Sequence, residues 1–288
     1  MLLKTPRAPW RFTVLSAAAL QLLVGTATAA ESAPEPEQFN VVVSQRLWFA
    51  DWQQQLLNVR VVTAPTATTP AVANIDYVRT SSAKTIPVTS LGFRYGRFLG
   101  AVSSFTSTTF GTNGDTASGQ STRSELDLSV GYQLVPGLSV SYIRKSGKTS
   151  ATSTASTSAL FGGDGQLKAA ANLLGVSANA PLSERLSLYG NLAGGPGRLT
   201  YNLTPSNVLK TDARYVVGEF GLVFRAGTDL FDGKLGALTL QLGYRTQSIH
   251  VPTTDYSSLA AYGFTVVDNQ RPGRTTTEGA VVGVGLVF

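Results

Sequence analysis

The chain has 288 residues, of which 43% are hydrophobic, only 14% are charged and 29 are glycines. It contains no cysteine, which excludes disulfides, thiolate metal sites and a lipid-modified N-terminal cysteine. The formal net charge is +6, but three of the 23 basic residues lie near the N-terminus. The remaining 20 face 17 acidic residues, a balance too even and too scattered to indicate nucleic-acid binding. Abundant Ser, Thr, Gly, Val, Leu and aromatic residues favour strands and turns.

Residues 1–30 have the three zones of a secretory signal peptide. Three basic residues precede an apolar stretch at 12–24, and small residues then suit cleavage after Ala29 or after the next residue. The apolar stretch is shorter than the ~20 residues that a membrane-spanning helix needs, so we predict export and cleavage. The acidic, proline-containing segment 31–38 is interpreted as a short periplasmic lead-in, and 39–288 as one domain.

Period-two alternation recurs along that domain and predicts strands with one apolar and one polar face. The first strand covers 38–50, with these residues on its apolar face: Phe39, Val41, Val43, Leu47 and Phe49. The clearest hairpin turns at Pro136-Gly137, and these residues of its two strands share the apolar side: Leu126, Leu128, Val130, Tyr132, Leu134, Leu138, Val140 and Tyr142. Two such strands joined by a two-residue turn are typical of a periplasmic hairpin of a membrane barrel.

Long and short connections alternate along the chain. The expected long loops are 51–84, 110–121, 145–166, 204–212 and 252–276, and the shorter turns lie near 97 and at 136–137, 181–185 and 227–236. This asymmetry predicts an all-β, antiparallel transmembrane β-barrel with long external loops and short periplasmic turns. We expect ten strands, or twelve if two weak pieces at 57–63 and 73–79 also join the barrel.

Two segments depart from the regular pattern. Eight of the ten residues in 149–158 are Ser or Thr, which predicts a low-complexity part of a loop. Across the cluster at 194–197, the apolar residues move from even positions, such as Leu192, to odd positions, such as Leu199 and Tyr201. This shift predicts a β-bulge at the cluster.

The terminal strand resembles the C-terminal assembly signal of bacterial outer-membrane β-barrels. Gly283, Leu286 and the terminal aromatic Phe288 carry the resemblance, while Val281 stands where the family pattern usually has a polar residue. The resemblance implies location in the outer membrane, insertion by the barrel assembly machinery, and contact with outer-membrane lipid and lipopolysaccharide. It indicates no functional subfamily.

Charged residues on the polar faces are expected to point into the lumen. They are Arg46, Arg94, Glu125, Asp127, Glu219, Arg225 and Arg245. These side chains could line a pore that selects solutes, but we favour opposed charges that pair and fill a narrow lumen. His250, followed by Asp255 and Asp268, is the only possible imidazole base, and no motif accompanies it.

We therefore predict no enzyme and no catalytic, cofactor or metal site. The expected role is structural or one of surface interaction through the long external loops. The alternative is a porin-like passive channel for small solutes. An embedded hydrolase or acyltransferase that uses His250 is the third hypothesis.

Overall fold

The computed structural model describes residues 39–268 and 272–288, apart from the gaps 56–57, 64–72, 77–78, 115–117, 154–165, 205–206, 227–236 and 253–263. The predicted signal peptide at 1–30 and the lead-in at 31–38 lie outside the described residues, and so does the predicted turn at 227–236. Among the described residues, no helix is long and apolar enough to cross a membrane.

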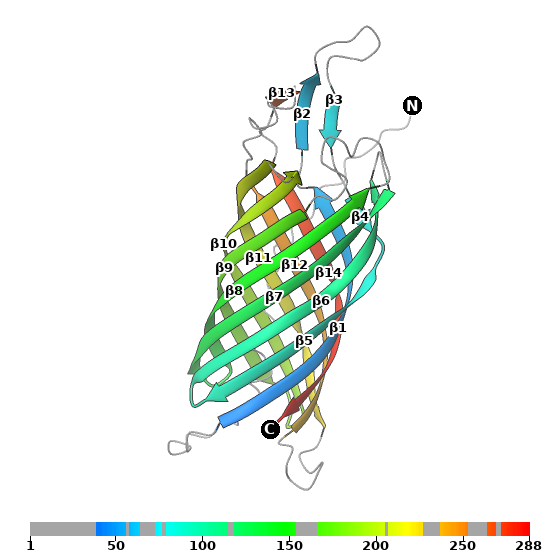
Figure 1. Cartoon of the computed structure of the whole chain (residues 1–288). Helices are drawn as coiled ribbons and strands as arrows, with labels where there is room; N and C mark the ends of the chain where they lie inside the picture. The colour runs from blue at the N-terminus through cyan, green and yellow to red at the C-terminus, as the bar shows by residue number, and fades with distance from the viewer. Residues whose placement is uncertain are drawn as a thin grey trace, which may run out of the picture.

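Ten long antiparallel strands form a closed barrel (Figure 1). In the order in which they pair around the barrel, they are β1 (Phe39–Gln55), β5 (Lys84–Tyr95), β6 (Phe98–Gly114), β7 (Ser118–Val135), β8 (Leu138–Ser153), β9 (Gln166–Pro181), β10 (Leu186–Thr204), β11 (Asn207–Ala226), β12 (Ala237–Val251) and β14 (Gly273–Val287). The predicted ten-stranded transmembrane β-barrel is confirmed. Apart from the pair β1 and β14, neighbouring strands in this ring are consecutive barrel strands along the chain.

The first and last strands close the ring. β1 pairs with β14 over a continuous register from Val42 opposite Val287 to Gln55 opposite Arg274. Beyond the ladder, the Phe288 amide donates to the Val41 carbonyl at 2.8 Å. The first and last strands thus close the barrel, and within the described residues every barrel strand has a neighbour on both sides.

The two weak strand pieces do form strands, but they do not enlarge the barrel. β2 (Asn58–Thr63) pairs with β3 (Ala73–Asp76) and with β13 (Phe264–Asp268) in a separate three-stranded sheet. Figure 1 shows this sheet beyond one end of the barrel. The short β4 (Arg79–Ser81) pairs with both β1 and β6, the two neighbours of β5. It therefore occupies the position between them beyond the end of β5.

The barrel ends differ, and we call them the turn end and the loop end. Tight turns at Gly96 and Gly137, with φ of 55° and 79°, lie at the turn end beside both ends of the barrel chain. At the loop end the strands run further than expected. The segments predicted as loops at 110–114, 145–153 and 207–212 are strand, and the predicted loop 252–276 contains β13 and the start of β14. The connections from β6 to β7 and from β10 to β11 are consequently shorter than predicted.

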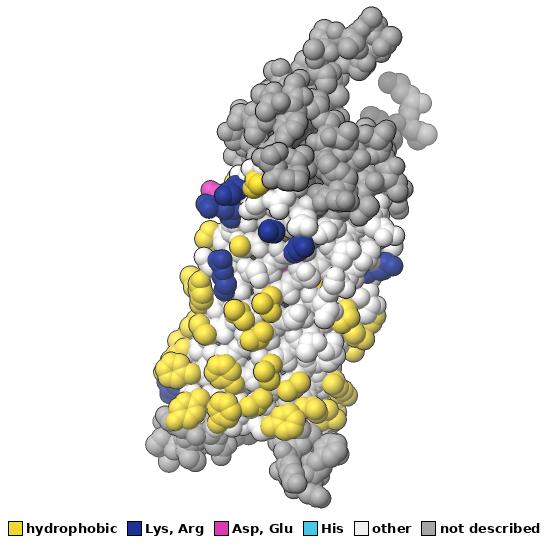
Figure 2. All heavy atoms as spheres, viewed as in Figure 1, with side chains coloured by type: hydrophobic (Ala, Val, Ile, Leu, Met, Phe, Trp, Pro, Cys, Tyr) yellow, Lys and Arg dark blue, Asp and Glu magenta, His cyan; other side chains and the backbone are white. Residues whose placement is uncertain are grey.

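An apolar band surrounds the half of the barrel nearer the turn end (Figure 2). On β7, the exposed residues from Leu126 to Leu134 cover nine positions, which matches the ~9–11 residues of a spanning strand. On β9, two successive leucines face opposite sides: Leu174 is 74% exposed on the band, while Leu173 is 1% exposed and faces the lumen. The strands beyond the band therefore stand above the membrane.

The predicted bulge at 194–197 is wrong. β10 pairs with β11 in one register from Leu186 to Asn202, so odd positions face the lumen along this whole length. Leu192 lies on the outer face, whereas Leu199 and Tyr201 are buried inside. Above the membrane the outer wall meets water and not lipid, so apolar residues there gain by facing inward.

Candidate functional site

The lumen is the candidate site, because most of the charges predicted to face inward meet there. Arg46, Glu125, Glu219 and Arg245 are buried, and Asp127 lies beside them with its side chain 18% exposed. Arg94 and Arg225 are half-buried on the inward face at the turn end, where Arg94 Nε donates to the carbonyl of Gly96.

One buried cluster is centred on Glu219 of β11. Its carboxylate lies 3.3 Å from Nη1 of Arg46 and 3.7 Å from Nη1 of Arg245. The hydroxyl of Tyr189 and the amide of Gln241 both donate to Oε1, at 3.1 Å and 2.8 Å. Since Glu219 is fully buried, three hydrogen-bond donors and the nearby Arg245 cation replace the water that its charge would otherwise bind.

A second buried cluster is centred on Glu125 of β7. Lys145 of β8 places Nζ 2.7 Å from Glu125 Oε2 and 2.8 Å from Asp127 Oδ1. Arg123, two residues away on the same face, donates to Oε1 through Nε and Nη2. The cluster thus balances two cations with two carboxylates, as burial of charge requires.

The Glu125 cluster also joins opposite walls of the barrel. Nε2 of Gln247 on β12 donates to Oε1 of Glu125 at 2.8 Å. In the ring of ten strands β7 and β12 are five places apart, so this hydrogen bond crosses the full lumen. Arg123 makes a similar crossing, because its Nη1 lies 2.5 Å from the hydroxyl of Thr277 on β14.

Apolar side chains fill much of the remaining interior. One cluster contains Trp48, Ala50, Trp52, Ile86, Val88, Phe105, Phe110 and Val281, and another contains Ile143, Ala171, Leu173, Ala193, Leu199, Tyr201, Ala213, Tyr215, Val217, Ile249 and Val251. The Arg245 guanidinium lies 4.9 Å above the Trp48 ring, which links the first cluster to the Glu219 charges. The interior is therefore packed with ion pairs and apolar groups together.

Sequence reasoning missed several members of the two charge clusters. Arg123 shares the inward parity of Glu125, so period two alone could have placed it. Lys145 was assigned to a loop because the strand was expected to end before it. For Tyr189 and Gln247 the sequence indicates only that their odd-numbered positions face the lumen. Their contacts with Glu219 and Glu125 depend on which strands face each other across the barrel.

His250 does not face the lumen. It is exposed on the outer face of β12, and its neighbours across the two strand pairings are Arg214 and Arg274. Two flanking cations are unsuited to activate an imidazole base, which is usually oriented by a carboxylate. Asp255 lies outside the described residues, and the structure describes only the backbone of Asp268.

A row of polar side chains lines the lumen nearer the turn end. Ser139, Ser177 and Asn191 lie directly opposite one another across β8, β9 and β10. All three are buried, and their side-chain polar atoms have no hydrogen-bond partner among the described residues. Such groups are normally satisfied by internal water. Within the described part of the chain, no group of three or more His, Asp or Glu side chains could hold a metal ion.

Comparisons with known proteins give matches among solved structures alone. No family model and no curated protein matches the sequence. Among solved structures, the chain is similar to the outer membrane protease OmpT from Escherichia coli, with 8% identity, 89% of this chain and 99% of that chain covered, and a TM-score of 0.47. It is also similar to the translocator domain of autotransporter NalP from Neisseria meningitidis, with 13% identity, 87% of this chain and 89% of that chain covered, and a TM-score of 0.40. A FadL homologue from Pseudomonas aeruginosa is similar with 10% identity, 87% of this chain and 90% of that chain covered, and a TM-score of 0.33.

These solved structures are a protease, the translocator domain of an autotransporter and a FadL homologue. At such identities and TM-scores the likeness concerns the barrel fold alone. The barrel fold rests on the strand pairing of this chain itself, and the role of the protein has to be argued from its own residues.

Proposed function

We propose that this protein is a non-conducting, non-enzymatic barrel of the outer membrane that serves a structural or surface-interaction role at its loop end. The observation that carries the proposal is the hydrogen bond between Glu125 and Gln247, which joins diametrically opposite strands. A solute passing along the lumen would have to break this contact and displace buried, paired charges.

The cost of opening such a path supports a static interior. Glu125 holds two cations and Gln247, and separating it from either cation would leave a buried charge without its partner. Breaking a buried ion pair by loss of one partner costs about 3–5 kcal/mol. The lumen therefore acts as a rigid core that holds the barrel wall in place.

A passive channel is the second candidate, and the unpartnered row of Ser139, Ser177 and Asn191 favours it. This row points to a hydrated chamber at the turn end. A channel would need that chamber to continue past Glu125 to the loop end.

Liposome swelling separates the two functions. Vesicles that contain the folded full-length protein are placed in isosmotic solutions of sugars and amino acids of increasing size. We expect swelling no faster than in protein-free vesicles for every solute. Swelling that depends on solute size would replace the proposal by the passive channel. A porin reconstituted in parallel verifies that the assay responds.

A further inference from the structure

The turn-end half of the lumen carries more positive than negative charge on its inward face. In the described strands, Arg94 of β5 and Arg225 of β11 are the only charged residues that face inward between the turns and the Glu219 cluster. That cluster itself joins Glu219 to two arginines, Arg46 and Arg245. Four arginines thus share this half of the lumen with a single carboxylate, a balance that favours an acidic occupant.

The same half of the lumen also offers hydrogen-bonding groups to an occupant. Ser139, Ser177 and Asn191 face inward there with 0%, 2% and 4% of their surface exposed, and their side-chain polar atoms have no partner among the described residues. Polar groups buried to this extent are normally satisfied by whatever lies against them. A partner rich in carbonyl and carboxylate oxygens would accept hydrogen bonds from the hydroxyls and the amide.

The chain has an acidic segment at this end of the barrel. Phe39, the first residue of β1, is directly opposite Tyr95 beside a turn, and Asn40 is directly opposite Arg94. The segment 31–38, which immediately precedes β1, has the sequence ESAPEPEQ, with three glutamates and no basic residue. Its two prolines offer carbonyl oxygens but no amide donors, which suits the lumen and disfavours a place in the barrel wall.

The segment 31–38 is long enough to reach both arginines of the turn end. Eight extended residues span up to about 26 Å, whereas ten strands about 4.8 Å apart and tilted by about 40° form a ring roughly 20 Å across. Arg94 lies on the strand next to β1, and Arg225 lies on β11, three strands from β1 in the other direction. Because the segment is joined to β1, its docking is intramolecular and has a high effective concentration.

We propose that residues 31–38 fold back into the turn-end half of the lumen and dock against Arg94 and Arg225, with Glu35 and Glu37 as the acidic contacts. The docked segment would close the turn end of the barrel from within. The inference requires only that these residues stay attached to β1, so it does not depend on whether the lumen conducts past the buried charge clusters.

Cysteine labelling tests this docking, because the chain has no cysteine of its own. The variant A33C places a thiol in the segment, and E184C places one in the exposed turn between β9 and β10 as a reference. Both proteins are purified folded from the outer membrane and treated with a polyethylene-glycol maleimide too bulky to enter the lumen. An ion pair at about 4 Å in water contributes a factor of about five, so two pairs should make A33C react roughly 25-fold more slowly than E184C.

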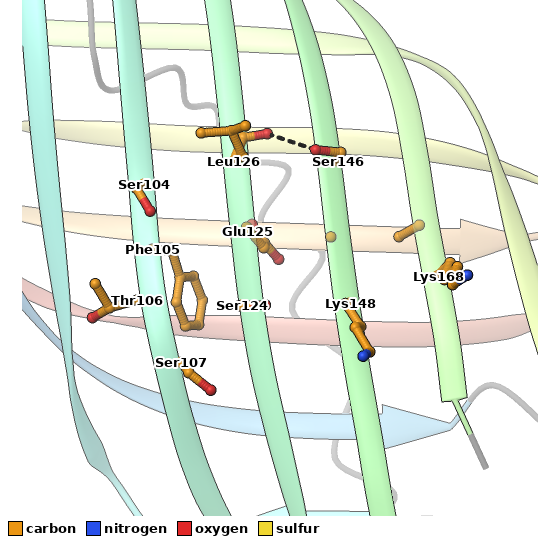
Figure 3. Close-up of a pocket in the computed structure, with 12 residues that line it drawn as sticks. Ser104, Phe105, Thr106, Ser107, Ser124, Glu125, Leu126, Ser146, Lys148 and Lys168 are labelled. Atoms are coloured by element: carbon orange, nitrogen blue, oxygen red, sulfur yellow. Dashed lines mark hydrogen bonds between the residues drawn. The ribbon is translucent and has the colours of Figure 1, made fainter.

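Removing the two arginines should release the segment. In the A33C background, R94Q/R225Q should raise the labelling rate roughly 25-fold. The matched control K148Q/K168Q removes the same charge from the outer wall, where Lys148 and Lys168 line a groove (Figure 3), and it should leave the thiol protected. Equal acceleration in both double variants would overturn the proposal, because net charge alone would then explain the protection.

A variant of the segment itself guards against misfolding of the barrel. E35Q/E37Q changes no residue of the barrel wall, so the amount of heat-modifiable barrel on a gel should stay the same while A33C becomes labelled as fast as E184C. Fast labelling of A33C without further changes, or slow labelling of A33C in E35Q/E37Q, would show that the proposal is wrong. Labelling does not measure ion flow, so this failure is distinguishable from a failure of the closed lumen, which channel recording detects.

Discussion

Replacing Glu125 by glutamine should destabilise the barrel strongly, although the side chain keeps its size. Glutamine retains one oxygen acceptor but removes the charge that Lys145 and Arg123 share in the lumen. At an effective dielectric constant of about 20, the attraction between Lys145 Nζ and a carboxylate oxygen at 2.7 Å amounts to about 6 kcal/mol.

Part of this attraction is offset, because the variant no longer has to bury a carboxylate. Lys145 also keeps its contact with Asp127. Loss of one partner from a buried ion pair typically costs 3–5 kcal/mol, and the remaining contact places E125Q near the lower limit. We therefore expect the free energy of unfolding to fall by about 3 kcal/mol.

Tryptophan fluorescence during urea unfolding in lipid vesicles provides the assay, since Trp48 and Trp52 are buried in the lumen and report on its collapse. The matched control is D212N. Asp212 pairs with Arg198 at 3.5 Å on the outer surface, where the two side chains are 82% and 65% exposed, so this variant should lose less than about 1 kcal/mol. Equal, small losses in both variants would refute a dry, charge-paired lumen and indicate that water screens Glu125.

Three further changes test the fold. F288A should lower the amount of folded protein in the outer membrane several-fold, because Phe288 pairs with Val41 and ends the segment that resembles the assembly signal. The assay is the amount of heat-modifiable barrel on a gel, with F288Y as control. An unchanged amount of barrel in F288A would count against this prediction. L128R, on the apolar band, should lower the free energy of unfolding in vesicles by about 2–4 kcal/mol. T122R, on the same face above the band, should lower it by under about 1 kcal/mol. Equal losses would show that the apolar band does not mark the position of the membrane. G137A should destabilise the barrel by about 1–2 kcal/mol, because φ is 79° and a Cβ would lie 2.5 Å from the Asn179 carbonyl oxygen. The control G111A, whose Cβ would meet nothing within 4 Å, should leave urea unfolding unchanged. Equal effects of the two variants would show that the turn is not constrained.

Sequence patterns predicted the membrane-facing part of the molecule well. Within the band, lipid demands an apolar residue at every second position, so strands such as β7 and β14 carry a readable period. Beyond the band this demand ends. Leu199 and Tyr201 therefore face inward there. The Ser/Thr-rich start of the segment 149–158 extends β8, because a strand outside the lipid needs only backbone pairing with its neighbours.

The candidate site was predictable only in part. Parity placed Arg46, Glu125, Glu219 and Arg245 in the lumen, because inward and outward positions alternate along each strand. Their partners depend on the shear and diameter of the barrel, which bring β7 opposite β12.

Single-channel recording tests the closed lumen most directly. The full-length protein is inserted into a planar bilayer at high potassium chloride concentration, beside the variant E125A/Q247A, which removes both side chains of the contact between opposite walls. We expect the unaltered protein to give no stable conductance steps, and the variant to give brief ones. Stable, ohmic steps from the unaltered protein would show a continuous aqueous path past Glu125 and contradict the account.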